Sequence, residues 1–465
     1  MEVTDADILR ARKKSTEQSI EELTRQLTLL RAQQASIDIE LSKIVYPVLL
    51  LPTEIISAVF RAATIGTASA SDPYDLVPLL LAISGVCRLW RQIAISDPTL
   101  WTNLVFNYGF VEPGELFKCF VSRSAGLPID VAAFLPYPTD LETDLWTSAH
   151  QWRRAKFLGA DHPIPFPIEY WDSGPLTLPF LEELTLDVDP VDEAAGEAMF
   201  SVVPRLTTLR ISYLTLVAEL AFPADQLTKV ELLRPQYTTA IAELLPSLVN
   251  LEELTVGNVL YEEALVAPIV SAPRLHTVIC QGSEWQPAVV LLQHLTLPAL
   301  HTLHLTHVPF PMDYVDAFLA RSGPLKKLTL RNAGFQTTMA FFDSPYVQDV
   351  VDFVLEPGPM STGEEHRVRA ALREGALPKL RSFALDLPSS LLADRAIDVQ
   401  AYISAVHGRV RDFRPLEEFT LNFATKSWEV PKVDVGSLRR LKDEFGLRIN
   451  LPSGILVKQK VAGLE

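Results

Sequence analysis

The sequence predicts an α/β protein in which an N-terminal helical region precedes an array of parallel strands and covering helices. Three observations lead to this prediction. A heptad pattern lies near the N-terminus, amphipathic segments occupy residues 51–104, and an apolar motif recurs about every 25 residues from residue 180 onward. Because 465 residues exceed the usual size of a single core, we expect several domains or a repeat array.

Residues 5–45 are predicted to form one long helix. Its apolar positions are spaced alternately by three and four residues, the heptad pattern of a helix that packs along another helix. These positions are Ile20, Leu23, Leu27, Leu30, Gln34, Ile37, Leu41 and Ile44. Two interpretations stay open: the helix packs back on its own protein, or residues 20–44 form a coiled coil with a second copy. In a coiled coil, Gln34 would fix the register. In a helix that packs on its own protein, Gln34 would face a solvent-filled groove.

Residues 46–106 are predicted to form a module of three short helices. Pro52 occupies the first helical position, where its missing N–H is tolerated, and a Ser/Ala/Asp/Pro-rich loop over 64–77 follows the helix. Asp97 is expected to cap a third helix, with Pro98 just inside it. The apolar stripes of the first two helices are Ile55, Ile56, Val59 and Phe60, then Ile83, Val86, Trp90 and Ile93.

From residue 179 to 465 the pattern apolar-x-x-apolar-x-apolar predicts short strands with one wet face. A proline lies within the five residues before each strand, where it would end a preceding helix. Strands alternating with amphipathic helices at this period are typical of a leucine-rich-repeat solenoid, whose parallel strands line a concave wall. The motifs begin at Leu181, Leu206, Leu227, Leu251, Leu275, Leu300, Leu325, Val350, Leu380 and Leu416.

The two ends of this array are predicted separately. Residues 107–178 are expected to contain divergent first repeats or a linker, with strands in LPIDVAAFL and QWRRAKFL and a helix in GELFKCFVSRSA. At the far end, LRRLKDEFGLRINL is expected to supply a last helix and strand that cap the array.

Composition excludes several classes of function. The net charge of −16, without a basic cluster, disfavours nucleic acid, and the longest apolar runs are far shorter than the ~20 residues that span a bilayer. The N-terminus does not resemble a signal peptide, and Cys87, Cys119 and Cys280 form no CxxC pair, so we expect neither zinc nor disulfides. We therefore place the protein in the cytoplasm, the nucleus or both.

A search for catalytic signatures finds no phosphate-binding glycine loop, metalloprotease motif or nucleophile elbow. We expect no catalytic residues, no cofactor and no metal, and we interpret the histidines between residues 294 and 307 as solvated side chains. The wet face of the repeats has mixed charge. Its candidates for binding a target protein are Arg210, Lys229, His304, Lys327 and Arg331.

The segments LPTEIISAVF and VCRLWRQIAISDPTLW resemble the F-box, whose pattern runs Leu-Pro-x-Glu-Ile, Val-Cys-x-x-Trp and Leu-Trp. Those places are held by Leu51, Pro52, Glu54, Ile55, then Val86, Cys87, Trp90, then Leu100 and Trp101. The loop over 64–77 is longer than in compact F-boxes. With the heptad helix and the repeats, nearly the whole chain resembles the F-box/leucine-rich-repeat proteins of fungi.

The resemblance implies a substrate receptor of an SCF-type cullin ubiquitin ligase. Such a receptor does no chemistry; it docks on the Skp-family adaptor, and through it on the cullin, while its repeats hold a target protein. The implied adaptor-facing residues are Leu51, Pro52, Ile55, Val86, Cys87 and Trp90, with Trp101 anchoring the third helix internally. The alternative is a repeat-based interaction scaffold without a ligase partner, and an enzyme is disfavoured because no convergent acid, base or metal groups are found.

Overall fold

The computed structural model describes fifteen stretches of the chain and divides it into two compact units, Met1–Leu100 and Trp101–Glu465. The described residues are 5–42, 47–68, 76–106, 113–134, 139–163, 177–189, 200–212, 222–235, 238–259, 269–281, 288–306, 312–388, 398–413, 416–424 and 435–450. Leu41 and Ile44, two of the heptad positions, have side chains outside this description. Each unit is described by itself below.

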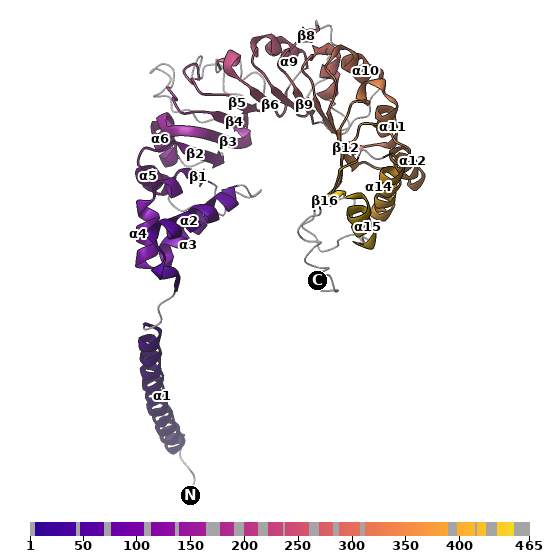
Figure 1. Ribbon diagram of the computed structural model, residues 1–465. Helices are drawn as coiled ribbons and strands as arrows, with labels where there is room; N and C mark the ends of the chain where they lie inside the picture. The colour runs from indigo at the N-terminus through magenta and orange to yellow at the C-terminus, as the bar shows by residue number, and fades with distance from the viewer. Residues whose placement is uncertain are drawn as a thin grey trace. The chain divides into compact units, whose positions relative to one another are not determined.

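The first unit is helical. Its elements are α1 (Asp5–Ser42), the 3-10 turn η1 (Pro47–Leu50), α2 (Thr53–Ala68), α3 (Leu76–Val86) and α4 (Arg88–Ser96) (Figure 1). Helices α2, α3 and α4 contact one another and share an apolar core. The buried side chains of this core include Ile56, Phe60, Leu80, Ile83, Ile93 and Ala94.

Two details of this unit differ from the prediction. The segment expected as one helix over residues 83–93 is broken at Cys87, whose backbone is extended (φ −157°, ψ 172°) and whose Sγ accepts a hydrogen bond from the Trp90 N–H at 3.5 Å. Cys87 is thus the N-cap of α4, a position that requires non-helical backbone. The expected third helix is only the 3-10 turn η3 (Pro98–Trp101), because a strand begins at Asn103.

The second unit is built on a sheet of fourteen parallel strands that lie in chain order. They are β1 (Asn103–Phe106), β2 (Ile129–Phe134), β3 (Trp152–Pro163), β4 (Glu183–Asp189), β5 (Thr208–Ile211), β6 (Lys229–Leu232), β7 (Glu253–Val256), β9 (Thr277–Cys280), β11 (Thr302–Thr306), β12 (Lys327–Ala333), β13 (Asp352–Pro357), β14 (Ser382–Pro388), β15 (Glu418–Ala424) and β16 (Arg448–Asn450). A separate pair joins β8 (Val270–Ser271) to β10 (Leu295–Thr296).

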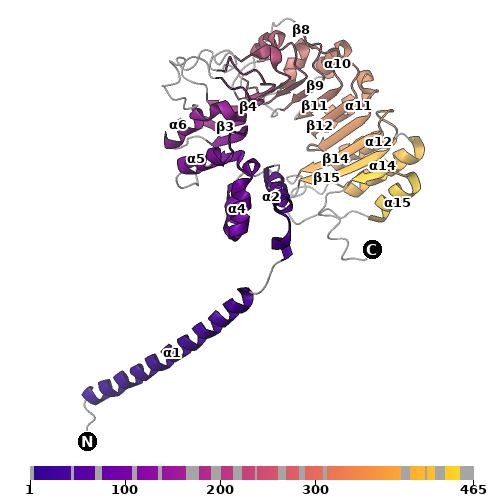
Figure 2. The same ribbon diagram turned by 60° about the vertical axis from the view of Figure 1, so that its left-hand side comes forward.

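Helices cover one face of this sheet, its outer face, and the face turned away from these helices is its inner face (Figures 1 and 2). The helices are α5 (Pro113–Arg123), α6 (Thr139–Thr147), α9 (Thr238–Leu244), α10 (Met312–Arg321), α11 (Phe335–Asp343), α12 (Thr362–Arg373), α14 (Val399–Phe413) and α15 (Val435–Phe445). The 3-10 turns are η4 (Ala149–Gln151), η5 (Ala224–Gln226), η6 (Leu245–Ser247), η7 (Ala288–His294) and η8 (Pro345–Val347). Between the motifs that begin at Leu275 and Leu300, where the repeat pattern predicts an amphipathic helix, residues 288–296 form η7 and β10 instead.

Each strand from β4 to β15 in the large sheet begins two residues after the first apolar residue of its motif, as Glu183 follows Leu181 and Glu418 follows Leu416. All three apolar positions of every motif are buried. Because strand side chains alternate between faces, the positions between them lie on the opposite, inner face. The sequence pattern therefore fixed the start and the register of ten strands.

The backbones that follow strands β6 and β7 approach each other closely. At Gly257, just after β7, the N–H donates to Leu232 O at 2.6 Å, and a Cβ atom would lie 2.0 Å from Leu233 O. Only glycine fits this contact between neighbouring strands. Further along, Phe353, Phe383 and Phe419 stack in register with centroids 5.8 Å apart, which extends the core beneath β13, β14 and β15.

Candidate functional site

Helix α2 of the first unit has an apolar face that the core of the unit does not cover. Ile56 and Phe60 are buried, whereas Ile55 and Val59 are 49% and 56% exposed. Ala58 and Ala62 are exposed as well, so the sequence i, i+3, i+4, i+7 from Ile55 gives a continuous apolar stripe on the helix surface. Helix α2 therefore has two apolar sides, one used within the unit and one unused.

The residues that directly precede α2 are apolar and exposed as well, and so is one residue at the end of α3. Leu50 and Leu51 precede α2 and are 74% and 42% exposed, and Val86 at the end of α3 is 60% exposed. Pro52 is also exposed and lies one residue before the helix, where its carbonyl accepts the N–H groups of Ile55 and Ile56 at 3.0 and 3.2 Å. Exposed apolar residues gathered in one place are typical of interaction sites, unlike isolated ones.

Trp90 links this surface to the core. Its indole ring is half-buried and meets the ring of Phe60 edge to face, with centroids 5.0 Å apart. Such aromatic contacts stabilise beyond the area they bury. Trp90 therefore holds α4 against α2 while part of its ring remains exposed.

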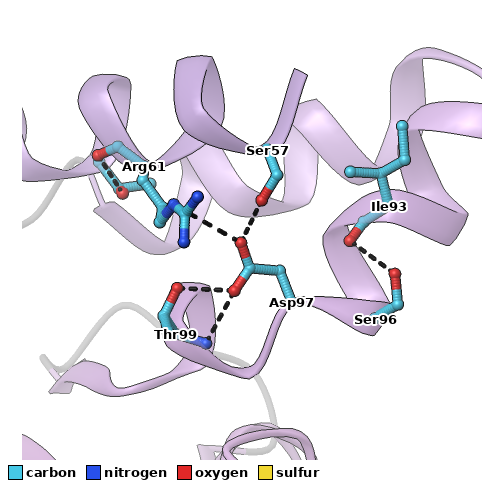
Figure 3. A network of polar contacts seen from close by, with 7 residues as sticks. Ser57, Arg61, Ile93, Ser96, Asp97 and Thr99 are labelled. Atoms are coloured by element: carbon cyan, nitrogen blue, oxygen red, sulfur yellow. Dashed lines mark hydrogen bonds and ion pairs between the residues drawn. The ribbon is translucent and has the colours of Figure 1, made fainter. Parts of the chain in front are cut away.

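A polar network fixes α2 against the end of α4 (Figure 3). The Asp97 carboxylate accepts hydrogen bonds from the Ser57 hydroxyl and from the Thr99 N–H (3.1 Å) and hydroxyl (2.6 Å), and it lies 3.8 Å from Arg61 Nε. Burial raises the pKa of Asp97, but the hydrogen bonds and the Arg61 charge outweigh it, and the net pKa is below the ordinary 3.8. Asp97 caps the η3 turn, as the sequence predicted for a helix.

Beside this network, a hollow of about 400 Å³ lies between α2 and α4. Glu54, Arg61 and Gln92 lie along its polar side, and Leu89 and Ile93 contribute apolar atoms. This arrangement has charged and apolar groups but no pair of groups placed to move a proton or attack a bond.

The structure places the six predicted adaptor-facing residues in one small unit. Leu51, Pro52, Ile55 and Val86 are exposed, and Cys87 and Trp90 are half-buried. Sequence reasoning missed Leu50 and Leu81, both more than half exposed, and it listed Val59 in the apolar stripe of the first helix without including it in the adaptor-facing set. The i, i+3, i+4, i+7 pattern beginning at Ile55 was the signal that could have revealed Val59 as a surface residue. Trp101, the last residue of η3, is fully buried, and its ring packs on the ring of Phe120 with centroids 4.9 Å apart.

The predicted target-binding residues lie on the inner face of the sheet, and several take part in ion pairs within a strand or between strands. Arg210 and Lys229 lie 3.4 and 3.3 Å from Glu231, and Lys229 also lies 3.4 Å from Glu253. Arg331 lies 3.8 Å from Asp386 and 3.9 Å from Glu356. Of the five, Lys327 and His304 make no ion pair with any described residue.

His304 lies between these charges in the middle of the face. Burial, together with the positive charges of Arg331 and Lys327, lowers its pKa to about 4, and Asp386 opposes the shift only in part. The imidazole is therefore neutral at pH 7, and its Nε2 has no hydrogen-bond partner among the described residues. The solvated state expected from the sequence is wrong for this histidine.

The other two histidines of this region stack on each other. The rings of His276 and His301 have centroids 4.6 Å apart and are nearly parallel. Within the described stretches, no group of three or more His, Cys, Asp or Glu side chains is arranged to hold a metal ion. A membrane-spanning helix, long and apolar enough for the bilayer, is likewise not found in the described part of the chain.

Comparison with known proteins agrees with the geometry of the first unit. Residues 48–107 match the family model described as F-box-like. The match begins in η1 and includes α2, α3, α4, η3 and β1. A search of the curated proteins finds none that matches the chain. The chain therefore carries an F-box-like domain, which includes all six residues of the predicted adaptor-facing set.

Proposed function

We propose that the protein is the substrate receptor of an SCF-type cullin ubiquitin ligase. The observation that supports this function is the exposed apolar surface of the F-box-like domain, which consists of Leu50, Leu51, Pro52, Ile55, Val59 and Val86. F-box domains generally bind Skp-type adaptors, so an adaptor is the partner that would cover these side chains. Covering them stabilises the complex, because each apolar side chain removed from water contributes roughly 1.5–3 kcal/mol when fully buried.

We assign the adaptor contact to Leu51, Pro52, Ile55 and Val86 of this surface together with half-buried Trp90, and we include Cys87 in the set for its effect on Trp90. Exposed Leu51, Ile55 and Val86 supply the apolar area, and Trp90 contributes the free edge of its ring. Cys87 acts indirectly, because it caps α4 and so orients Trp90. Tryptophan at the centre of an interface commonly dominates binding, at about 2 kcal/mol or more on truncation.

We assign the second unit as an irregular leucine-rich-repeat solenoid that holds the target protein. Its inner face presents Arg210, Lys229, His304, Lys327 and Arg331, with carboxylates beside four of them. Lys327 would bind an acidic group of the target most directly, since no carboxylate of a described residue pairs with it. The receptor itself would carry out no bond chemistry; it would raise the local concentration of target lysines near the ubiquitin-loaded subunit.

The test is co-purification of the full chain with a Skp-family adaptor. Ile55→Asp with Val86→Asp places two charges on the proposed contact, and we expect adaptor recovery to fall at least tenfold. Val249→Asp is the matched control, because Val249 is 55% exposed, as strongly as Ile55, but lies in the second unit. Equal adaptor recovery by the double variant and the control would contradict the proposal.

The alternative function is a repeat-based interaction scaffold without a ligase partner. One observation favours it: α2, α3 and α4 have a core of their own and a complete Asp97 network, so they could serve as a folded module without any adaptor. Reconstitution with adaptor, cullin, RING subunit and conjugating enzyme separates the two. Ubiquitin chains on a bound protein support the receptor, whereas binding without adaptor recruitment supports the scaffold.

A further inference from the structure

Helix α1 presents a row of apolar side chains that nothing in the described structure covers. Ile20, Leu23, Leu27, Leu30 and Ile37 are 48–64% exposed on this helix. They are a and d positions of a heptad, which form the seam between the helices of a coiled coil. An amphipathic helix is stabilised mainly by the surface on which its apolar face packs, so a partner is required.

We infer that α1 binds the α1 helix of a second copy of this chain as an antiparallel coiled coil. The heptad assigns Lys13, Ile20, Leu27 and Gln34 to position a, and Thr16, Leu23, Leu30 and Ile37 to position d. The orientation of the two helices follows from which side chains each orientation brings together.

A parallel pair is unfavourable, because it places every residue opposite its own equivalent. Lys13 would face the second Lys13 within the core layer, with two like charges in contact. Gln34 would likewise face the second Gln34. Of the charged residues that flank the seam and whose side chains are described, only Arg12 and Glu17 would meet an opposite charge across it.

An antiparallel pair removes these conflicts. Reversing the partner places position a opposite position d, so Ile20 faces Leu30 and Leu23 faces Leu27, giving four apolar layers in the pair. Gln34 then faces Thr16, which joins two polar side chains in one layer. Lys13 faces Ile37 and reaches out of the seam with its ammonium in water.

The charges beside the seam favour the same register. Reversal also places position e opposite e and position g opposite g. Glu17 then faces Arg31, and Arg12 faces Glu40, and each pair occurs twice in the dimer. If the partner helix is shifted by one heptad, Glu17 no longer faces Arg31 and Arg12 no longer faces Glu40. Glu17 has one contact within its own helix, to Lys13 at 3.7 Å, and both side chains are largely exposed, so this contact competes weakly.

The first test measures mass and charge dependence on the full chain. We expect light scattering to give twice 51.7 kDa at micromolar concentration. Glu17→Arg should weaken the dimer about tenfold, since it replaces two attractive pairs by two repulsive ones. Glu17→Arg combined with Arg31→Glu should restore the dimer, which a parallel pair does not predict. Glu21→Arg, the same charge change on the outer face, is the control and should leave the mass unchanged.

The second test determines orientation by disulfide cross-linking of two differently tagged chains. Leu23→Cys in one chain and Leu27→Cys in the other should cross-link to each other across the seam, and neither should cross-link to itself. The parent chain, with Cys87, Cys119 and Cys280, sets the background. Self-cross-linking of Leu23→Cys would show a parallel pair. A monomer at every concentration, or a dimer unaffected by Glu17→Arg, would overturn the inference.

Discussion

The Phe60 ring on α2 meets the Trp90 indole on α4 edge to face, with centroids 5.0 Å apart and planes inclined by 62°. The two residues are thirty positions apart in the chain. Their contact keeps α4 against the buried side of α2, so the other side of α2, with Ile55 and Val59, remains on the surface. A residue of the proposed interface is thus also part of the core that supports it.

Trp90 variants should separate these two roles. We expect Trp90→Ala to lower the free energy of unfolding of the first unit by about 2–3 kcal/mol, because the Phe60 contact and part of the buried area are lost. Trp90→Phe keeps an aromatic ring and removes an indole N–H that is buried without a partner, so it should cost less than 1 kcal/mol. Hydrogen exchange of the α2 and α4 amides measures both. Equal losses for the two variants would contradict this assignment.

This result also bears on binding assays. Loss of adaptor binding in Trp90→Ala would not distinguish a lost contact from a loosened unit. Ile55→Ala does distinguish them, because Ile55 is half exposed and its truncation should change stability by less than 0.5 kcal/mol.

Asp97→Asn should destabilise the first unit by about 1–2 kcal/mol at pH 7, since the carboxylate accepts from Ser57 and Thr99 together. The folded pKa of Asp97 is lower than its unfolded value, so this stabilisation is present above pH 3.8 and is lost as the pH falls through the folded pKa. The difference between parent and variant should therefore shrink toward pH 3 in urea titrations. Glu54→Gln, at an exposed carboxylate on α2, is the control; a similar loss in that variant would refute the role of Asp97.

His304 should make the second unit less stable in mild acid. Its folded pKa of about 4 lies below the ordinary 6.5, so the stabilisation from the neutral imidazole is complete above pH 6.5 and is lost as the pH falls toward 4. We expect the urea midpoint to fall between pH 7.5 and pH 5, and His304→Gln to remove most of this fall. His366→Gln, at an exposed histidine, should leave the pH dependence intact. An NMR titration that places the His304 pKa near 6.5 would contradict the structure.

Arg409 should be essential for the end of α12. This side chain is 2% exposed, and its guanidinium donates to the carbonyl oxygens of Leu372, Ala376 and Leu377 at 2.9, 2.6 and 2.7 Å, while burial lowers its pKa to about 10. Arg409→Met leaves these carbonyls without their donor and should cost about 2–4 kcal/mol. Arg411→Met, at an exposed arginine of the same helix, should leave the unfolding temperature nearly unchanged in the same thermal unfolding assay. A small loss at Arg409 would show that water replaces its hydrogen bonds.

Much of the fold could be predicted from local patterns. The apolar motif placed ten strands, because each motif brings its own buried residues, as Leu181, Leu184 and Leu186 illustrate. The helix over 5–42, the start of α2 near Pro52, the cap at Asp97 and the last helix and strand also followed from short-range signals. Such features depend on residues within a few positions of each other, and the sequence contains them directly.

The geometry of the candidate site depends on contacts between residues that are far apart in the sequence. Ser57 reaches Asp97 across forty positions, and Arg331 reaches Asp386 across fifty-five. The pKa of His304, the break at Cys87 and the exposure of Val59 likewise depend on which elements pack together. The sequence by itself therefore determined the period of the strands, the heptad of α1 and the presence of an F-box-like pattern. Only the tertiary structure decided which apolar side chains stay uncovered, because burial depends on distant segments that share no local pattern.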